Sequence, residues 1–132
     1  MGVLSNSMHI GLFVENMEKM VGFYRDILGL EASWDGGPYA EFTIKDGGLF
    51  MFDRKSFSES MNQPYVSPKG FNTTMEIGIG VPSPADVDSE YLRLTSLGIV
   101  SLTGEPITQP WGQRTFFFAD PEGNYIEIGA FI

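Results

Sequence analysis

Few side chains in this sequence are able to do chemistry. The chain has no Cys, which excludes disulfides, zinc–thiolate sites and thiol nucleophiles, and it has a single His, His9. The most unusual acid is Glu127, a carboxylate in the middle of an apolar run, between Ile126 and Ile128. If the face on which Glu127 lies is covered, this carboxylate needs a cation, a hydrogen-bond partner or a raised pKa. The chemistry of Glu127 therefore depends on the elements that position it.

A predicted β-hairpin carries Glu127. The residues of the turn, 120–123, read Asp-Pro-Glu-Gly: Asp caps the turn, Pro presets φ, and Gly accepts the positive φ that follows. β-Rich runs over residues 115–119 and 124–132 flank this turn. Alternation along the second run places Ile126 and Ile128 on one face and Glu127 on the other.

The same order of elements occurs twice. Residues 8–14 (MHIGLFV) and 75–81 (MEIGIGV) match in sequence and in alternation, so His9 and Glu76 take equivalent places. A helix is predicted after each run, the first capped by Asn16 and ended by Gly29, the second beginning with Ser83-Pro84 and ended by Gly98. Short strands are predicted next in each half, over residues 31–35, 39–45 and 49–53, and over 99–105, 113–119 and 124–132. The pattern is βαβββ twice over, an α+β fold in which each helix packs one face of a sheet.

The closing segment resembles a known family. Trp111-Gly112, an aromatic strand, Asp-Pro-Glu-Gly-Asn and Glu127 three residues later resemble the last hairpin of the vicinal oxygen chelate superfamily. That group contains glyoxalase I, bleomycin-resistance proteins, fosfomycin-resistance enzymes and extradiol dioxygenases. The resemblance covers residues 8–132 and implies that the two sheets face each other as a partly open mixed β-barrel with helices outside and a cleft inside. One domain over residues 1–132 would then hold modules at about 8–53 and 73–132, joined by a linker, 54–72, that packs as a connection or as a lid.

The resemblance also implies a metal site. Carried over to this sequence, it makes His9, Glu76 and Glu127 candidate ligands, a set that suits Mn²⁺, Fe²⁺, Ni²⁺ or Mg²⁺. The fourth position falls on Met51, or on Phe52 if the register slips by one residue, and neither can serve as a ligand of these ions. Glu76 is the candidate catalytic base of a glyoxalase-like lyase or isomerase. In the alternative without metal, Glu76 pairs with His9.

Residues of the 111–117 segment are expected to line a substrate site. The candidates for substrate binding are Met51, Trp111, Arg114, Thr115 and Phe117. If the turn is a three-residue loop with Gly123 in the left-handed region, Thr115 and Phe117 face the cleft with Glu127. A tighter register would present Arg114, Phe116 and Phe118 instead, with Arg114 either as an anion clamp or as a surface residue.

Composition narrows the partners. The net charge of −9 argues against nucleic acid and anionic membranes and is compatible with a cationic ligand. No apolar run is long enough to span a bilayer, and residues 1–7 lack the apolar core of a signal peptide, so we expect a cytoplasmic protein. Two functions are compatible with these observations: a metal-dependent lyase or isomerase acting on a small oxygen-rich substrate, and a non-catalytic drug-binding protein like the bleomycin-resistance proteins. The family resemblance further implies a homodimer.

Overall fold

The structure, a computed structural model, describes residues 2–5 and 7–132. The chain forms two compact units, Met1–Pro68 and Lys69–Ile132, which we call the first and second modules. Each contains a mixed four-stranded sheet, and the two sheets have the same connectivity. The α+β fold with a repeated βαβββ-like order is therefore confirmed, while the partly open barrel stays a prediction.

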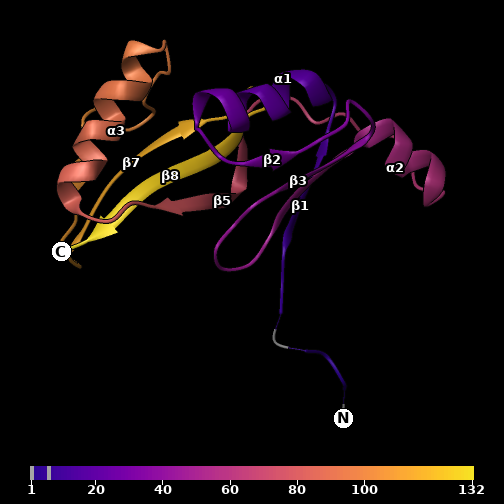
Figure 1. Cartoon of the computed structure of the whole chain (residues 1–132), viewed down its shortest axis with the longest axis horizontal. Coiled ribbons are helices and arrows are strands. Elements are labelled where there is room, and N and C mark those ends of the chain that lie inside the picture. The colour runs from indigo at the N-terminus through magenta and orange to yellow at the C-terminus, as the bar shows by residue number, and fades with distance from the viewer. Residues whose placement is uncertain (1, 6) are drawn as a thin grey trace. The chain divides into compact units, whose positions relative to one another are not determined.

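The first module is built on the strand order β1-β4-β3-β2. Figure 1 labels three of these strands, β1, β2 and β3. Strand β1 (Ile10–Val14) runs parallel to β4 (Leu49–Asp53), and β3 (Tyr39–Phe42) and β2 (Ala32–Ser33) continue the sheet in antiparallel fashion. Helix α1 (Met17–Gly22) continues as a π-helical turn, η1 (Phe23–Ile27). The Asn16 side chain caps α1 by accepting a 3.0 Å hydrogen bond from the Lys19 amide, as the sequence predicts.

One face of this sheet is the core of the first module. Its buried strand residues alternate along β1, β3 and β4, and they pack beneath α1 and η1; they are Leu12, Val14, Ala40, Phe42, Leu49 and Met51. The helical side chains that cover them are Met17, Met20, Val21, Phe23 and Tyr24. We call the opposite face of the sheet the open face of the first module.

The predicted linker begins with a helix. Helix α2 (Arg54–Ser60) follows β4 directly, and the last strand residue, Asp53, caps it by accepting a 2.9 Å hydrogen bond from the Ser56 amide. The Phe57 ring of α2 stacks on Phe13 of β1, with ring centroids 4.0 Å apart. Residues 54–68 thus belong to the first module, and α2 packs on its open face.

The second module repeats the plan with the strand order β5-β8-β7-β6. Its elements are β5 (Asn72–Gly80), α3 (Pro84–Ser96), β6 (Ile107–Thr108), β7 (Gln113–Ala119) and β8 (Asn124–Phe131). Helix α3 covers one face, where the buried side chains are Ile77, Val87, Leu94, Phe116, Phe118, Ile126, Ile128 and Ala130. The other face, which carries Glu76 and Glu127, is the open face of the second module.

The hairpin between β7 and β8 has the predicted turn. The buried Asp120 carboxylate accepts hydrogen bonds from the amides of Glu122 and Asn124 at 2.9 and 3.0 Å, and Gly123 adopts a φ of +90°. The strand predicted over 99–105 is wrong: the short β6 lies later, at Ile107–Thr108. Gly104, at a φ of +75°, interrupts this stretch, and Pro106 follows directly after it. No described helix is both long and apolar enough to cross a bilayer.

Candidate functional site

The register of the parallel strand pairs defines the equivalent positions in the two modules. In the second module Gly78 of β5 pairs with Glu127 of β8, and in the first module Gly11 of β1 pairs with Phe50 of β4. Gly11 and Gly78 are the matching glycines of MHIGLFV and MEIGIGV. The counterpart of Glu127 is therefore Phe50.

Two carboxyl groups meet on the open face of the second module. Glu76 and Glu127 are close enough for a hydrogen bond between their side chains. Partial withdrawal from water raises the pKa of Glu76, and the neighbouring Glu127 raises that pKa further. The Thr115 hydroxyl, 2.8 Å from Glu127 Oε2 and 3.0 Å from the Ile128 carbonyl oxygen, helps to hold the Glu127 carboxylate in place. This arrangement keeps a proton available on Glu76 at a higher pH than an isolated glutamate would.

The β7–β8 register agrees with the three-residue loop. Phe117 pairs directly with Glu127, and Thr115 pairs with Gly129, so both candidates lie on the open face. The tighter register is wrong, because Phe116 and Phe118 are buried on the helix side. Arg114 also lies on that side.

Arg114 forms an ion pair with helix α3. Its Nε and Nη2 donate to the two carboxylate oxygens of Asp88 at 2.8 and 2.7 Å, and its Nη1 donates to the Thr108 hydroxyl at 2.9 Å. The guanidinium and the carboxylate stabilise each other's charge, which raises the pKa of Arg114 and lowers that of Asp88. The arrangement joins α3 to the sheet and favours the alternative in which Arg114 is a surface residue over the one in which it is an anion clamp.

Met51 is also placed differently from the expectation. It lies on the core face beneath α1 with no exposed surface, because β4 pairs with β1 through Leu12 and Met51. The alternative residue, Phe52, lies on the open face, but it pairs with Phe13 and is thus two residues beyond the equivalent position. Sequence reasoning missed Phe50, because the matching glycines, Gly11 and Gly78, locate it only when the pairing of β1 with β4 is known.

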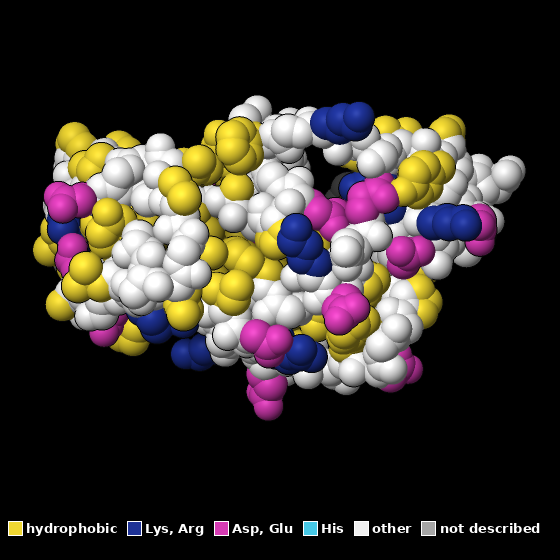
Figure 2. All heavy atoms as spheres, turned by 90° about the horizontal axis from the view of Figure 1, so that it is seen from above, with side chains coloured by type: hydrophobic (Ala, Val, Ile, Leu, Met, Phe, Trp, Pro, Cys, Tyr) yellow, Lys and Arg dark blue, Asp and Glu magenta, His cyan; other side chains and the backbone are white. Residues whose placement is uncertain are grey.

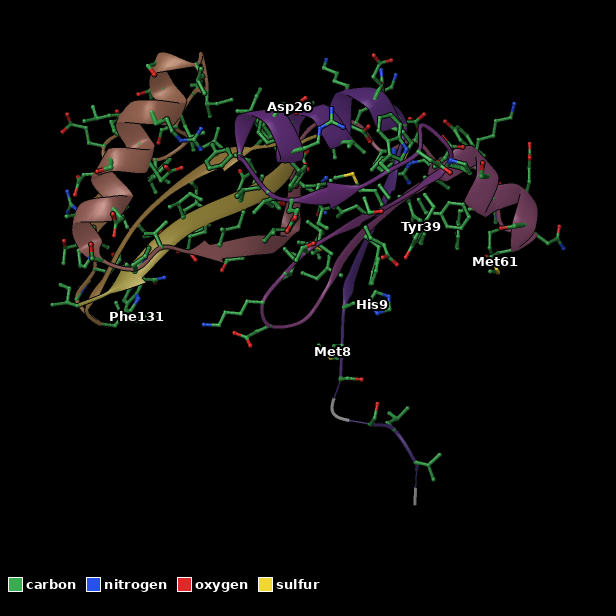
Figure 3. All side chains as sticks on the ribbon, viewed as in Figure 1. Met8, His9, Asp26, Tyr39, Met61 and Phe131 are labelled. Carbon is green, nitrogen blue, oxygen red and sulfur yellow. The ribbon has the colours of Figure 1, made fainter. Side chains whose placement is uncertain are left out.

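Aromatic side chains cover the open face of the first module. We call them the ring row: His9, Phe13, Tyr39, Phe50, Phe52 and Phe57. Tyr39 stacks on Phe50 with centroids 5.9 Å apart and an interplanar angle of 18°, and the His9 ring meets Phe50 edge-on at 4.7 Å. Figure 3 labels His9 and Tyr39 of this set. The row continues from Tyr39 to Phe52 at 6.4 Å, from Phe52 to Phe57 at 6.3 Å, and from Phe57 to Phe13.

A hollow of about 260 Å³ lies at the Phe13 end of the ring row. Its walls are formed by Phe13, Arg54, Phe57, Gln63, Pro64 and Val66. The Arg54 guanidinium donates to the carbonyl oxygens of Phe13 and Val66 at 2.6 and 3.0 Å, and its Nε lies 3.5 Å from Glu15 Oε1. Glu15 also accepts from the Tyr65 hydroxyl, and hydrogen bonds from Ser67 and Tyr65 lower the pKa of Glu15. These contacts fix residues 65–67 beside the open face of the first module.

The ligand set expected for a metal ion is divided between the modules. His9 belongs to the first module, where it is exposed just before β1, and the two carboxylates belong to the second. Within residues 2–5 and 7–132, no three His, Asp or Glu side chains gather as a metal-holding cluster. Phe50 at the fourth position has no ligand atom, so the described residues do not fit a four-ligand centre.

The chain has two Trp residues, of which Trp111 is exposed and Trp34 is half-buried. Trp111 is 65% exposed, and its indole N–H donates to Gln113 Oε1 at 3.0 Å. Trp34, in the loop before β3, donates to the Gly37 carbonyl oxygen at 2.7 Å. Each module therefore carries one Trp, which provides a separate fluorescence signal for each.

Comparison with known proteins identifies the family to which this chain belongs. The family model described as Glyoxalase/Bleomycin resistance protein/Dioxygenase superfamily matches residues 7–128, and the chain belongs to this superfamily. A crystal structure of a glyoxalase/bleomycin resistance protein/dioxygenase from Nocardioides has the same fold, with a TM-score of 0.82 and 24% identity over 100% of this chain and 87% of the other.

Two curated relatives have about the same level of identity and different names. The phenazine antibiotic resistance protein EhpR of Enterobacter agglomerans is 30% identical over 120 residues, 89% of this chain and 85% of that protein. The trivalent organoarsenical cleaving enzyme of Bacillus sp. (strain MD1) is 30% identical over 122 residues, 91% of this chain and 70% of that enzyme. The superfamily thus includes similar proteins named for resistance and for catalysis.

Proposed function

We propose that this chain is a small-molecule-binding protein that holds a planar aromatic ligand against the ring row of the first module. The observation that carries the proposal is the position of Phe50. This residue occupies the place equivalent to Glu127 and is flanked by Tyr39 and His9 in ring contact. Where the second module offers a carboxylate, the first module offers a stack of rings.

The physical basis is stacking on a surface that is already formed. Tyr39 is 46% exposed and Phe13 is 40% exposed, whereas the residues that alternate with them along the strands are buried on the opposite face: Leu12, Val14 and Ala40. Offset stacking of aromatic rings contributes about 0.5–1.5 kcal/mol beyond the area buried. The name of the relative EhpR, a phenazine antibiotic resistance protein, supports the choice of a planar heteroaromatic ligand.

A titration with phenazine tests this function. Binding is followed by calorimetry and by the fluorescence of Trp34 in a Trp111→Phe variant, which reports on the first module alone. Phe50→Leu is expected to weaken binding by about three- to tenfold, the equivalent of one stacking contact. Phe131→Leu, which removes a 71% exposed ring from the second module, is the matched control. Equal affinity of the Phe50→Leu variant and the wild type would exclude the ring row as the site.

A metal-dependent lyase or isomerase of the glyoxalase type is the second candidate. The contact between Glu76 and Glu127 favours it, because a carboxyl group with a raised pKa is suited to general acid–base work, with Glu76 as the base. In this candidate His9, Glu76 and Glu127 bind the divalent ion, Mn²⁺, Fe²⁺, Ni²⁺ or Mg²⁺. Thr115, Phe117 and Trp111 remain predicted to contact the substrate.

Metal analysis separates the two candidates. Protein purified without chelator or affinity tag is assayed for bound metal, and thermal unfolding is measured with added Mn²⁺ or Ni²⁺. The second candidate predicts stabilisation that His9→Ala and Glu127→Gln each abolish. If added metal does not change the thermal unfolding midpoint of the wild type, the metal-dependent candidate is excluded and only the binding function remains.

The proposal includes a cytoplasmic homodimer, as the family resemblance implies. Size-exclusion chromatography with light scattering tests the assembly: a single species near 14.6 kDa, the mass of one chain, would contradict it.

A further inference from the structure

We infer that Glu41 makes the ring row selective for a positively charged aromatic ligand, a conclusion that rests on the proposed function. Glu41 lies on β3 and pairs with Phe50 of β4, while its neighbour on the same face, Tyr39, pairs with Phe52. A carboxylate is thus placed at the edge of the ring row, beside its stacked pair of rings.

The Tyr39 side chain positions this carboxylate. The Tyr39 hydroxyl donates a 3.0 Å hydrogen bond to Glu41 Oε1, and the Tyr39 ring stacks on Phe50. Partial withdrawal from water, followed by the contact with Glu41, raises the pKa of Tyr39, so the phenol stays protonated and remains a donor. One oxygen of Glu41 is held beside the rings, and Oε2 accepts no hydrogen bond from the described residues.

The charge of Glu41 is not compensated by an ion pair. In the first module the guanidinium of Arg54 lies near Glu15, and Arg25 pairs with Asp26. No ion pair within residues 2–5 and 7–132 involves Glu41. A cationic ligand would therefore meet a carboxylate whose charge is still unmatched. The chain as a whole is also acidic, with a net charge of −9. Figure 2 shows Asp and Glu side chains interspersed with Lys and Arg on the face that it draws.

This chemistry defines a ligand class. A fused-ring cation with amino substituents stacks on Tyr39 and Phe50 through its π-face, where its positive charge is attracted to the electron-rich rings. An N–H at its edge donates a charge-assisted hydrogen bond to Glu41. A neutral fused ring of the same size makes only the stacking contact, and an anionic one is repelled.

The test uses tricyclic probes matched in size: proflavine as the cation, phenazine as the neutral ring system and phenazine-1-carboxylate as the anion. For the wild type we expect the affinity order proflavine, phenazine, phenazine-1-carboxylate. Glu41→Gln is expected to lower the affinity for proflavine about three- to tenfold, as suits an exposed charge-assisted contact, and to leave phenazine unchanged. Glu18→Gln is the control, because it changes the net charge equally from an exposed position on α1.

The outcomes separate this inference from the function on which it rests. If phenazine and proflavine both bind, and Glu41→Gln affects them equally or affects neither, the role of Glu41 is wrong and the binding function stands. Tighter binding of phenazine-1-carboxylate than of proflavine would also overturn it. If no probe binds or if Phe50→Leu leaves all affinities unchanged, the proposed function itself fails. Circular dichroism confirms that each variant is folded before its affinity is compared.

Discussion

Phe50 and Glu127 occupy the same place in the two modules, each paired with a glycine of the neighbouring parallel strand. Around Phe50 the module gathers rings, including Tyr39 and His9. In the second module, Glu127 is surrounded by oxygen atoms, which belong to Glu76 and Thr115. A single position therefore gives one open face an aromatic character and the other a carboxyl character.

The first prediction separates two adjacent residues of β4. Met51→Ala is expected to lower the free energy of unfolding by about 2–5 kcal/mol, because it leaves a cavity at a fully buried site. Phe50→Ala, whose side chain lies on the open face, is expected to lower it by less and to weaken phenazine binding instead. Urea denaturation and calorimetry check both effects. A loss of binding without a loss of stability in Met51→Ala would reverse these assignments.

The sequence predicted the elements that carry this site better than the side chains that face it. The internal repeat, the Asn16 cap and the Asp120 turn are local signals, and the structure contains all of them. The face on which Met51 lies depends on how β4 pairs with β1, and no local signal in Leu49–Asp53 fixes that, since apolar residues occupy both faces of the strand. The matching glycines, Gly11 and Gly78, identify Phe50 as the counterpart of Glu127 only once this pairing is known.

The choice between the two roles predicted for Arg114 could not be made from the sequence, for a related reason. Its role depends on a partner from helix α3, Asp88, which is separated from it by 26 residues. Sequence alternation along β7 can divide the residues into two faces, but it cannot identify the face that binds a ligand until the turn register is known. The three-residue loop gave the correct register, and in that register Arg114 lies on the helix side.

A second prediction follows from the Glu76 pKa. A carboxyl group whose pKa is raised by folding stabilises the folded state below its unfolded pKa and loses that contribution as the pH rises through its folded pKa. Glu76→Gln removes a carboxylate that ionises beside Glu127, so the variant should have a higher melting temperature than the wild type near neutral pH. The difference should shrink as the pH falls towards 4.5, the ordinary value for the group.

Thermal unfolding by circular dichroism between pH 4 and pH 8 measures this difference. Glu18→Gln, which removes the charge of an exposed residue on α1, shows how much comes from net charge alone. A Glu76→Gln variant that is less stable than the wild type at neutral pH would show that ionised Glu76 has a stabilising partner.

The third prediction concerns Arg114. Arg114→Met is expected to cost about 1 kcal/mol or less in unfolding free energy, because the paired Asp88 side chain is 44% exposed and solvent screens the interaction. Ligand affinity should not change, since the guanidinium lies on the helix side of the sheet. A double-mutant cycle with Asp88→Asn isolates the pair in urea denaturation. Loss of affinity for an anionic probe on Arg114→Met would restore the anion-clamp role.

The last prediction tests the turn that fixes the register of β8 and therefore the position of Glu127. Gly123 has a φ of +90°, and a Cβ added there would lie 2.2 Å from the Gly70 carbonyl oxygen. Gly123→Ala should therefore combine backbone strain of about 1–3 kcal/mol with a steric clash that forces residues 70–71 to move. Gly36→Ala is the control, because Gly36 has the same φ of +90° and no heavy atom within 4 Å of an added Cβ. In urea denaturation Gly123→Ala should be clearly less stable than Gly36→Ala, and equal losses would mean that the close approach of Gly70 contributes nothing.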